Sequence, residues 1–351
     1  MELNNNDISN QSVLDKYILG IETSCDDTAI ALIRGNEILA NVVLKQEHKK
    51  GVIPEYAARA HHVALFEHAR EVIKNHTIDL VAYTNEPGLV GSLFVGANFA
   101  KSLAYMLDVP SIAINHLAGH MLLPYWLSRV ADTQADNHLQ FPYLCLLVSG
   151  GHTMIVLVED VEKYRIISTT LDDAVGEVFD KVARNIGLDY PGGPNIERLA
   201  QNCKDTGNKY SFPFVMRNRL EFSFSGLKTA AIEQINIDAK LEEKQDFCYA
   251  FQEHVAMLLT EKMKQTHEQY LTKHWVVSGG VAANKKIRAS LDAAAKELGV
   301  NMHYPDIALC TDNGVMIACV GQLLYQKAWQ QTKQQMLTTK PSAQSHWLLI
   351  S

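Results

Sequence analysis

Two periods of apolar residues alternate along the chain, one typical of strands and one typical of helices. Short apolar runs predict buried strands at 17–22, 28–33, 78–83, 110–114, 143–148, 153–158 and 274–278. Longer segments with helical spacing lie at 54–75, 93–107 and 312–328. Strands that alternate with helices in this way predict an α/β layer fold.

The pattern restarts after residue 140, which suggests that the chain contains one architecture twice. A strand, a polar turn and a returning strand occupy 17–33 and again 143–158. Residues 130–140 are polar and form the best candidate for a linker. The predicted division is a disordered leader at 1–16, an N-terminal domain at 17–130, a C-terminal domain at 141–330 and a tail at 331–351. Within the C-terminal domain, we expect helix 312–328 to pack back toward the first domain.

The candidate metal ligands begin with His116 and His120. Side chains four apart on a helix share one face, and the preceding run predicts a strand, so the pair would begin a helix where open α/β sheets bind ligands. With 14 histidines in the chain, such a pair also arises by chance. We expect this helix to break near Pro124. Asp312 is either the third ligand of an open metal site or, more commonly for such a residue, a helix cap.

Three polar turns follow predicted strands. Thr23–Asp27 offers hydroxyls, amides and two carboxylates, although an ordinary polar turn explains it equally well. Ser149–His152 contains two glycines that let backbone amides approach a phosphate, although a plain hairpin turn is the commoner explanation. Ser278–Val281 is followed by Asn284 at the start of a helix, again a suitable place for a nucleotide.

Two further segments combine polar residues with helical pattern. Residues 172–181 predict a helix with an acidic first turn, and Pro191–Pro194 precedes a helix that carries Glu197. The segment 222–229 mixes aromatic residues, hydroxyls and Lys228, and it fits a packed corner as well as a ligand loop. The helix at 54–75 is expected to bury one apolar side, formed by Ala57, Ala60, Val63, Ala64, Ala69 and Val72.

Composition narrows the class of protein. A chain of 351 residues with 47% apolar content can bury a full core. The net charge of −7 provides no global basic field, so an RNA contact needs local groups such as Lys285, Lys286 and Arg288, or a partner. Six cysteines without a CxxC pair indicate reduced core thiols. Because no secretory signal or apolar run of about 20 residues is recognisable, we expect a soluble cytoplasmic protein without a membrane span.

Taken together, nine segments in order resemble the TsaD family of tRNA N6-adenosine threonylcarbamoyltransferases, once labelled O-sialoglycoprotein endopeptidases. The segments, which span about residues 17–330, are Gly20–Thr28, Pro87–Gly91, His116 with His120, Leu147–Thr153, Asp172–Lys181, Tyr190–Pro194, Phe222–Lys228, Gly279–Asn284 and Cys310–Gly314. The resemblance implies two actin-like α/β domains, of the type found in Hsp70 and sugar kinases, with a cleft between them.

The same resemblance implies an activity and its residues. The protein would transfer the threonylcarbamoyl group from threonylcarbamoyl-AMP to N6 of adenosine-37 in tRNAs that read codons beginning with A, releasing AMP. One divalent metal, iron or zinc, would be bound by His116, His120 and Asp312, and Asp26 would be the catalytic base or a positioning group. The implied substrate-binding residues are Leu147, Val148, Ser149, Gly150, Gly151, Asp180, Gly193, Glu197 and Asn284.

The resemblance also implies partners, namely tRNA, a TsaB-like paralogue and a TsaE-like ATPase. The helix at 54–75 is our candidate contact for the paralogue. Two positions depart from the family pattern: Ala118 stands where glutamate is usual, and Glu86 where glycine is usual. On a regular helix, residue 118 lies about 180° from the midpoint of the two histidines, so its side chain points away from the metal.

Three alternatives belong to other classes. A non-catalytic or weakened paralogue acting as a scaffold would be expected to lose ligands, whereas every proposed metal and nucleotide position is present. A metalloprotease of the His-Glu-x-x-His type needs glutamate directly after the first histidine, where this chain has Leu117. A sugar or acetate kinase fits the glycine turns, and the histidine–aspartate set argues against it.

Overall fold

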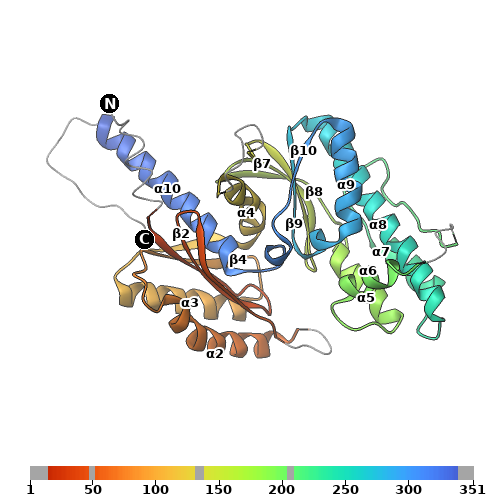
Figure 1. Ribbon diagram of the computed structural model, residues 1–351, viewed down its shortest axis with the longest axis horizontal. Coiled ribbons are helices and arrows are strands. Elements are labelled where there is room, and N and C mark those ends of the chain that lie inside the picture. The colour runs from red at the N-terminus through yellow and green to blue at the C-terminus, as the bar shows by residue number, and fades with distance from the viewer. Residues whose placement is uncertain (1–14, 47–51, 131–137, 204–208, 339–351) are drawn as a thin grey trace.

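The computed structural model describes residues 15–46, 52–130, 138–203 and 209–338 (Figure 1). Almost all of the predicted leader, most of the predicted linker and the end of the predicted tail lie outside these residues.

The first sheet contains five strands in the order β3-β2-β1-β4-β5. Strand β1 pairs antiparallel with β2 and parallel with β4, and β4 pairs parallel with β5. The strands are β1 Tyr17–Glu22, β2 Thr28–Arg34, β3 Glu37–Leu44, β4 Leu80–Glu86 and β5 Ser111–Asn115.

The second sheet repeats this topology in the order β10-β9-β6-β7-β8. Strand β6 pairs antiparallel with β7 and parallel with β9, and β9 pairs parallel with β10. The strands are β6 Tyr143–Val148, β7 Thr153–Asp160, β8 Lys163–Thr169, β9 His274–Ser278 and β10 Asn301–His303. The strand–turn–strand repeat seen in the sequence is therefore a repeat of a whole sheet.

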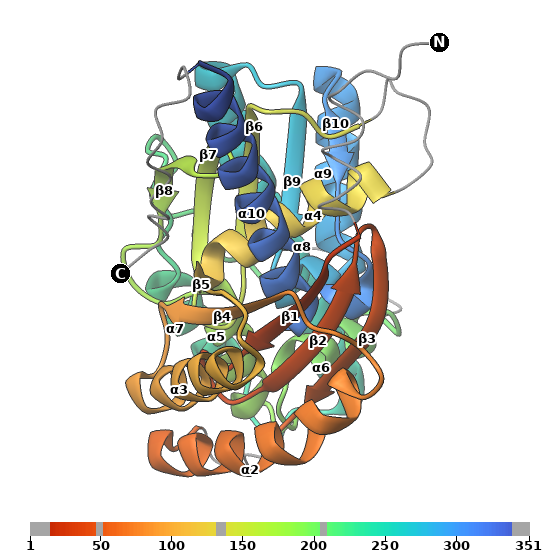
Figure 2. The same ribbon diagram turned by 90° about the vertical axis from the view of Figure 1, so that its left-hand side faces the viewer.

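The helices and sheets form alternating layers. The helices are α2 Pro54–Ile73, α3 Val90–Leu107, α4 His116–Val130, α5 Val175–Asn185, α6 Gly192–Ala200, α7 Ser225–Gln234, α8 Leu241–Tyr270, α9 Lys285–Leu298 and α10 Gly314–Thr338, with 3-10 helices η2 Gly280–Ala283 and η3 Ile307–Leu309. Figure 2 shows α2 and α3 along one face of the first sheet, with α4 and α10 beyond its other face. Helices α5 to α9 cover the far face of the second sheet.

Buried residues alternate between these layers because successive residues of a strand point to opposite faces. In β6, Leu144 and Leu146 pack with α5 to α9, whereas Tyr143 and Cys145 pack with α4 and α10. In β1, Ile18 faces α4 and α10, whereas Leu19 faces α2 and α3. Both faces of both sheets are covered, which explains the nearly continuous apolar strands in the sequence.

Two helices differ from prediction in detail. Val63 of α2 is exposed, and the face that α2 buries consists of Ala57, His61, Leu65, Ala69 and Val72. The predicted break at Pro124 is wrong, because α4 continues through this residue to Val130. A proline within a helix costs one hydrogen bond, and here Leu122, Leu123 and Trp126, all buried between the two sheets, hold the helix together by tertiary packing.

Two helix ends also differ. The acidic residues Asp172 and Asp173 precede α5 instead of forming its first turn, because the helix begins at Val175. Helix α10 extends to Thr338, well into the segment predicted as a polar tail. All six cysteines are free thiols, as their spacing in the sequence suggested.

Candidate functional site

The two histidines begin α4 at the carboxyl end of β5. His116 is the first helical residue, and Asn115 caps the helix, because its Oδ1 accepts the backbone N–H groups of Leu117 (2.9 Å) and Ala118 (3.3 Å). His116 and His120 then lie on the same side of the first turn, with ring centroids 4.8 Å apart. The predicted helix and the predicted histidine pair are both present.

Asp312 comes from the loop before α10 and does not cap this helix. That role belongs to Asn313, whose Oδ1 accepts the backbone N–H of Met316 (2.9 Å). The loop can lie against the first sheet because neither Gly20 nor Gly314 has a side chain. A Cβ on Gly20 would lie 2.2 Å from the Gly314 carbonyl oxygen. Close packing of α10 on β1 therefore brings Asp312 to the histidines.

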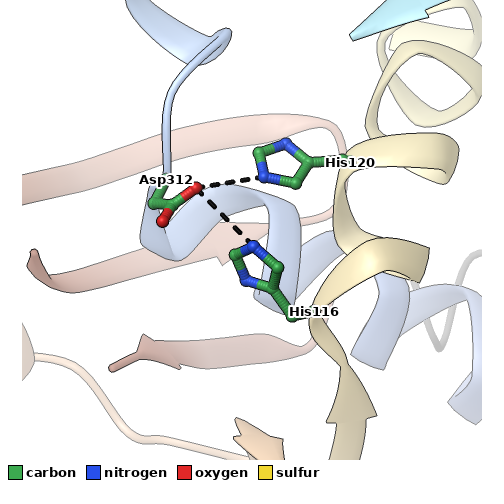
Figure 3. A group of neighbouring side chains, drawn as sticks. All are labelled: His116, His120 and Asp312. Carbon is green, nitrogen blue, oxygen red and sulfur yellow. Dashed lines mark hydrogen bonds and ion pairs between the residues drawn. The ribbon is translucent and has the colours of Figure 1, made fainter. Parts of the chain in front are cut away.

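These three side chains form one cluster (Figure 3). Asp312 Oδ1 lies 3.0 Å from His120 Nε2 and 3.7 Å from His116 Nε2. The candidate ligand atoms all lie within 4.8 Å of one another, and in the described part of the chain this is the only such group of three or more. Two imidazoles and one carboxylate are typical of metal sites that keep open positions for a substrate. The cluster is compatible with one metal ion.

The charges of the cluster depend on one another. Burial lowers the pKa of His116, but the carboxylates of Glu22 and Asp312 outweigh burial and raise it to about 9. Burial alone would raise the pKa of Asp312, whereas His116 and His120 hold it well below its ordinary value. The two shifts have one cause, because imidazoles and carboxylates lie together in a buried site where opposite charges stabilise each other.

Sequence reasoning missed Glu22, the last residue of β1. It is completely buried, and its Oε2 accepts a hydrogen bond from His116 Nδ1 (3.0 Å). A charged residue at the carboxyl end of an otherwise apolar strand was the signal available in the sequence.

The turn Thr23–Asp27 between β1 and β2, here called the first turn, is fixed by hydrogen bonds to two helices. The Cys25 carbonyl oxygen lies 2.9 Å from His61 Nε2 of α2 and accepts a hydrogen bond from Ser92 Oγ of α3 (3.0 Å). Burial and the neighbouring Asp26 raise the pKa of Asp27 to about 6. The half-buried Asp26 thus sits on a fixed turn rich in negative charge.

The turn Ser149–His152 between β6 and β7, here called the second turn, is open. Ser149 Oγ accepts the N–H groups of Gly151 (3.3 Å) and His152 (3.0 Å), and a Cβ on Gly150 or Gly151 would meet no atom within 4 Å. Burial lowers the pKa of His152, and His116 and His120 of the candidate metal cluster lower it further.

The other predicted substrate-binding residues lie on α5, on α6 and at the start of α9. Gly176 N–H donates to the Ser149 carbonyl (3.2 Å), which joins the turn to α5. Farther along α5, Asp180 Oδ1 accepts the Gly192 N–H (2.7 Å), and Glu197 Oε1 accepts the Lys285 N–H at the start of α9 (2.9 Å). The adjacent Gly193 has open space at its Cβ position.

Several predicted residues have side chains that are already engaged. Leu147 and Val148 are fully buried in the two cores on either side of the second sheet. Asn284 is the N-cap of α9, and its Nδ2 donates to Gln252. Arg288 stacks on Tyr304 and donates to two backbone carbonyls.

Comparison with known proteins identifies the family of the chain. A family model described as TsaD, tRNA N6-adenosine threonylcarbamoyltransferase, matches residues 37–319. A protein of that name from Syntrophomonas wolfei is 43% identical over 321 residues, covering 87% of this chain and 91% of the relative. One from Dictyoglomus turgidum is 42% identical over 327 residues, covering 89% and 94%.

Solved structures confirm the predicted fold class at lower sequence identity. Full-length HypF in its phosphate- and nucleotide-bound form has a TM-score of 0.57 at 14% identity, covering 89% of this chain and 46% of HypF. Component A of the (R)-2-hydroxyglutaryl-CoA dehydratase from Acidaminococcus fermentans has a TM-score of 0.52 at 16% identity, covering 90% and 99%. These likenesses show the actin-like fold alone. The sequence relatives show more: the chain belongs to the TsaD family of tRNA N6-adenosine threonylcarbamoyltransferases.

Proposed function

We propose that this protein transfers the threonylcarbamoyl group from threonylcarbamoyl-AMP to N6 of adenosine-37 in tRNAs that read codons beginning with A, with release of AMP. Family membership over nearly the whole chain supports the reaction. The observation that carries it is the intact His116, His120 and Asp312 cluster in a chain that also has the open second turn.

The metal site takes one divalent ion, which we propose to be iron or zinc. The ligands are His116 Nε2, His120 Nε2 and Asp312 Oδ1, the atoms that face one another in the cluster. Lewis-acid stabilisation of charge on a carbonyl or phosphate oxygen is the chemistry that the ion supplies when bound.

The second turn and its surroundings bind the adenylate. The amides of Gly150 and Gly151 are suited to the phosphate, because no Cβ keeps a ligand away from this backbone. Asp180 Oδ1 is used by Gly192, and we assign Oδ2 to the ribose hydroxyls. Gly193 and Glu197 border the nucleoside, and Asn284 shapes the pocket by fixing the start of α9.

Asp26 is the candidate base. The N6 amine of adenosine attacks the carbamoyl carbon, the bond to the AMP phosphate oxygen breaks, and the amine must lose one proton. A carboxylate on the first turn accepts that proton most readily where the turn is held in place, as it is here by His61 and Ser92. Because AMP is a competent leaving group, no covalent enzyme intermediate is needed.

Family membership suggests the partners, and the surface offers a place for one of them. Helix α3 is the one described helix long and apolar enough to cross a membrane, and only 28% of that stretch is buried. Exposed Phe66 of α2 and Phe94 and Met106 of α3 border a hollow of about 520 Å³ between the two helices. We assign this surface to a TsaB-like paralogue in the cytoplasm, in a system that also contains a TsaE-like ATPase. Phe66→Glu should abolish co-purification with the paralogue, whereas Tyr164→Glu, an exposed aromatic on β8, should not.

Nucleoside mass spectrometry tests the reaction. The protein, its partners, tRNA and threonylcarbamoyl-AMP should yield threonylcarbamoyladenosine. Asp312→Asn should lose bound metal and at least 100-fold of the activity while keeping its fold, because a carboxylate ligand is replaced by a weaker one. The matched control Asp306→Asn, an exposed aspartate six residues earlier, should behave like the parent. Stoichiometric metal and full activity in Asp312→Asn would reject the metal site; an inactive parent that still binds its partners would indicate a scaffold.

A further inference from the structure

Glu22 lies where three parts of the first half of the chain meet. Its Oε1 accepts the backbone N–H of Ser24 (2.5 Å) from the first turn. Its Oε2 accepts from Thr84 Oγ1 (2.5 Å) near the end of β4 and from His116 Nδ1 (3.0 Å) at the start of α4. A carboxylate with no solvent exposure is costly unless donors surround it, and this one has three.

The direction of the histidine hydrogen bond follows from the chemistry of the acceptor. An ionised carboxylate only accepts, so the proton shared with Glu22 belongs to His116 Nδ1. In the neutral imidazole the other nitrogen, Nε2, then carries the lone pair. It is Nε2 of His116 that faces Asp312 Oδ1. The buried carboxylate therefore selects the nitrogen that a cation in the cluster would use.

His120 has no such partner. Its Nε2 lies 3.0 Å from Asp312 Oδ1, while its buried Nδ1 has no hydrogen-bond partner among the described residues. The two histidines are therefore unequal: Nδ1 of His116 is bound by Glu22 and lies 3.1 Å from Ser24 Oγ, whereas in the described part of the chain His120 has a hydrogen-bond partner only on the side of Asp312.

We infer that Glu22 is a positioning residue for the metal centre, which keeps the proton of His116 on Nδ1 and presents Nε2 to the ion. This inference rests on the proposed metal site. Groups that orient a metal-binding histidine in this way typically contribute about 10- to 100-fold to metal affinity. Because Glu22 also binds the Ser24 amide, the same carboxylate ties the metal ligand to the turn that carries Asp26.

The test uses Zn²⁺ as the probe with the full-length protein. Affinity for Zn²⁺ is measured by competition with a chelating dye in the parent, in Glu22→Gln and in the control Thr84→Val. Glutamine replaces one acceptor by a donor, so Glu22→Gln should bind Zn²⁺ at least 10-fold more weakly. Thr84→Val removes a different hydrogen bond to the same carboxylate and should stay within about threefold of the parent. The affinity for AMP should be unchanged in both.

Equal Zn²⁺ affinity in the parent and Glu22→Gln would overturn the inference while leaving the metal site intact. An equal loss in Thr84→Val would also overturn it, since general disturbance of the buried carboxylate would then explain the effect. Absence of Zn²⁺ binding in the parent would overturn the metal site itself, and the inference with it.

A second measurement does not depend on the variant folding. In the Zn²⁺-loaded parent, long-range ¹H–¹⁵N NMR spectra distinguish the two nitrogens of each imidazole, with the His116 signals assigned by comparison with His116→Gln. A proton on His116 Nδ1 supports the inference. A proton on Nε2, with Nδ1 bound to zinc, would overturn it.

Discussion

The first and second turns occupy equivalent places in the two sheets, yet they are built in opposite ways. The first turn is packed against protein: the side chains of Glu22, His61 and Ser92 form hydrogen bonds with its backbone, and the last two belong to helices α2 and α3. The second turn is empty around Gly150 and Gly151, where a side chain would meet no protein atom. The first turn follows Glu22 and contains Asp26 and Asp27, whereas the second turn exposes backbone amides.

This difference shows how a duplicated element acquires two tasks. A turn that is packed on its inner side can hold carboxylates at fixed positions, which suits proton transfer and support of a cation site. A turn without side chains lets a ligand approach the backbone, which suits an anionic group. The predictions below use substitutions that should affect one turn and spare the other.

The largest effect is expected from closing the second turn. Gly150→Val adds a side chain into open space, so the melting temperature should hardly change. The same side chain should displace the adenylate, and a misplacement of about 1 Å can cost about 100-fold in rate. Transfer measured by nucleoside mass spectrometry, with calorimetry of AMP binding, checks this. Normal AMP binding in the variant would mean that the ligand does not contact this backbone.

Filling the space beside the first turn, where Gly88 of the loop before α3 packs against it, should instead cost stability. A Cβ on Gly88 would lie 2.4 Å from the Ser24 carbonyl oxygen, so Gly88→Ala forces the turn and the loop before α3 apart. Overpacking of this kind costs about 1–3 kcal/mol. Denaturant unfolding measures the loss, with Gly150→Ala as the matched glycine substitution that should cost little. Equal stabilities of Gly88→Ala and Gly150→Ala would mean that the two turns do not differ in how closely protein packs around them.

Asp180→Ala should weaken binding of the adenylate and leave the metal site unchanged. Loss of a charge-assisted hydrogen bond to ribose, about 1.5–3 kcal/mol, weakens AMP binding by about 10-fold or more. Metal content should not change. Because Asp180 also binds the Gly192 N–H, Asp180→Asn is the better-matched variant, and it should fall between the parent and alanine. If calorimetry gives one affinity for all three proteins, the ribose assignment is wrong.

The smallest effect on the metal is expected at Ala118, where the family usually has glutamate. Ala118 is 6% exposed and packs in the core between the sheets. In Ala118→Glu the affinity for Zn²⁺ should therefore change by less than about 10-fold, or about 1.4 kcal/mol. Stability should fall, because the new carboxylate is buried without a described partner. A much larger gain in affinity would mean that residue 118 reaches the metal.

Much of the architecture follows from local sequence pattern. The apolar runs, the helical spacing and the repeated strand–turn–strand units predict two α/β halves, and His116 and His120 share a face because they are four apart on a helix. These features depend on residues close in the chain, for which periodicity is sufficient evidence. The roles of the individual substrate-binding residues remain predictions.

Other features were decided only when distant segments packed together. The sequence alone left Asp312 as either a cap or a ligand. In the structure Asn313 takes the cap, and the close approach of the loop to Gly20 places Asp312 beside the two histidines. The persistence of α4 through Pro124 depends on burial between two sheets. Glu22 reaches His116 across 94 residues of chain. Such contacts leave no period in the sequence, because a hydrogen bond between distant residues is determined by the packing of whole elements.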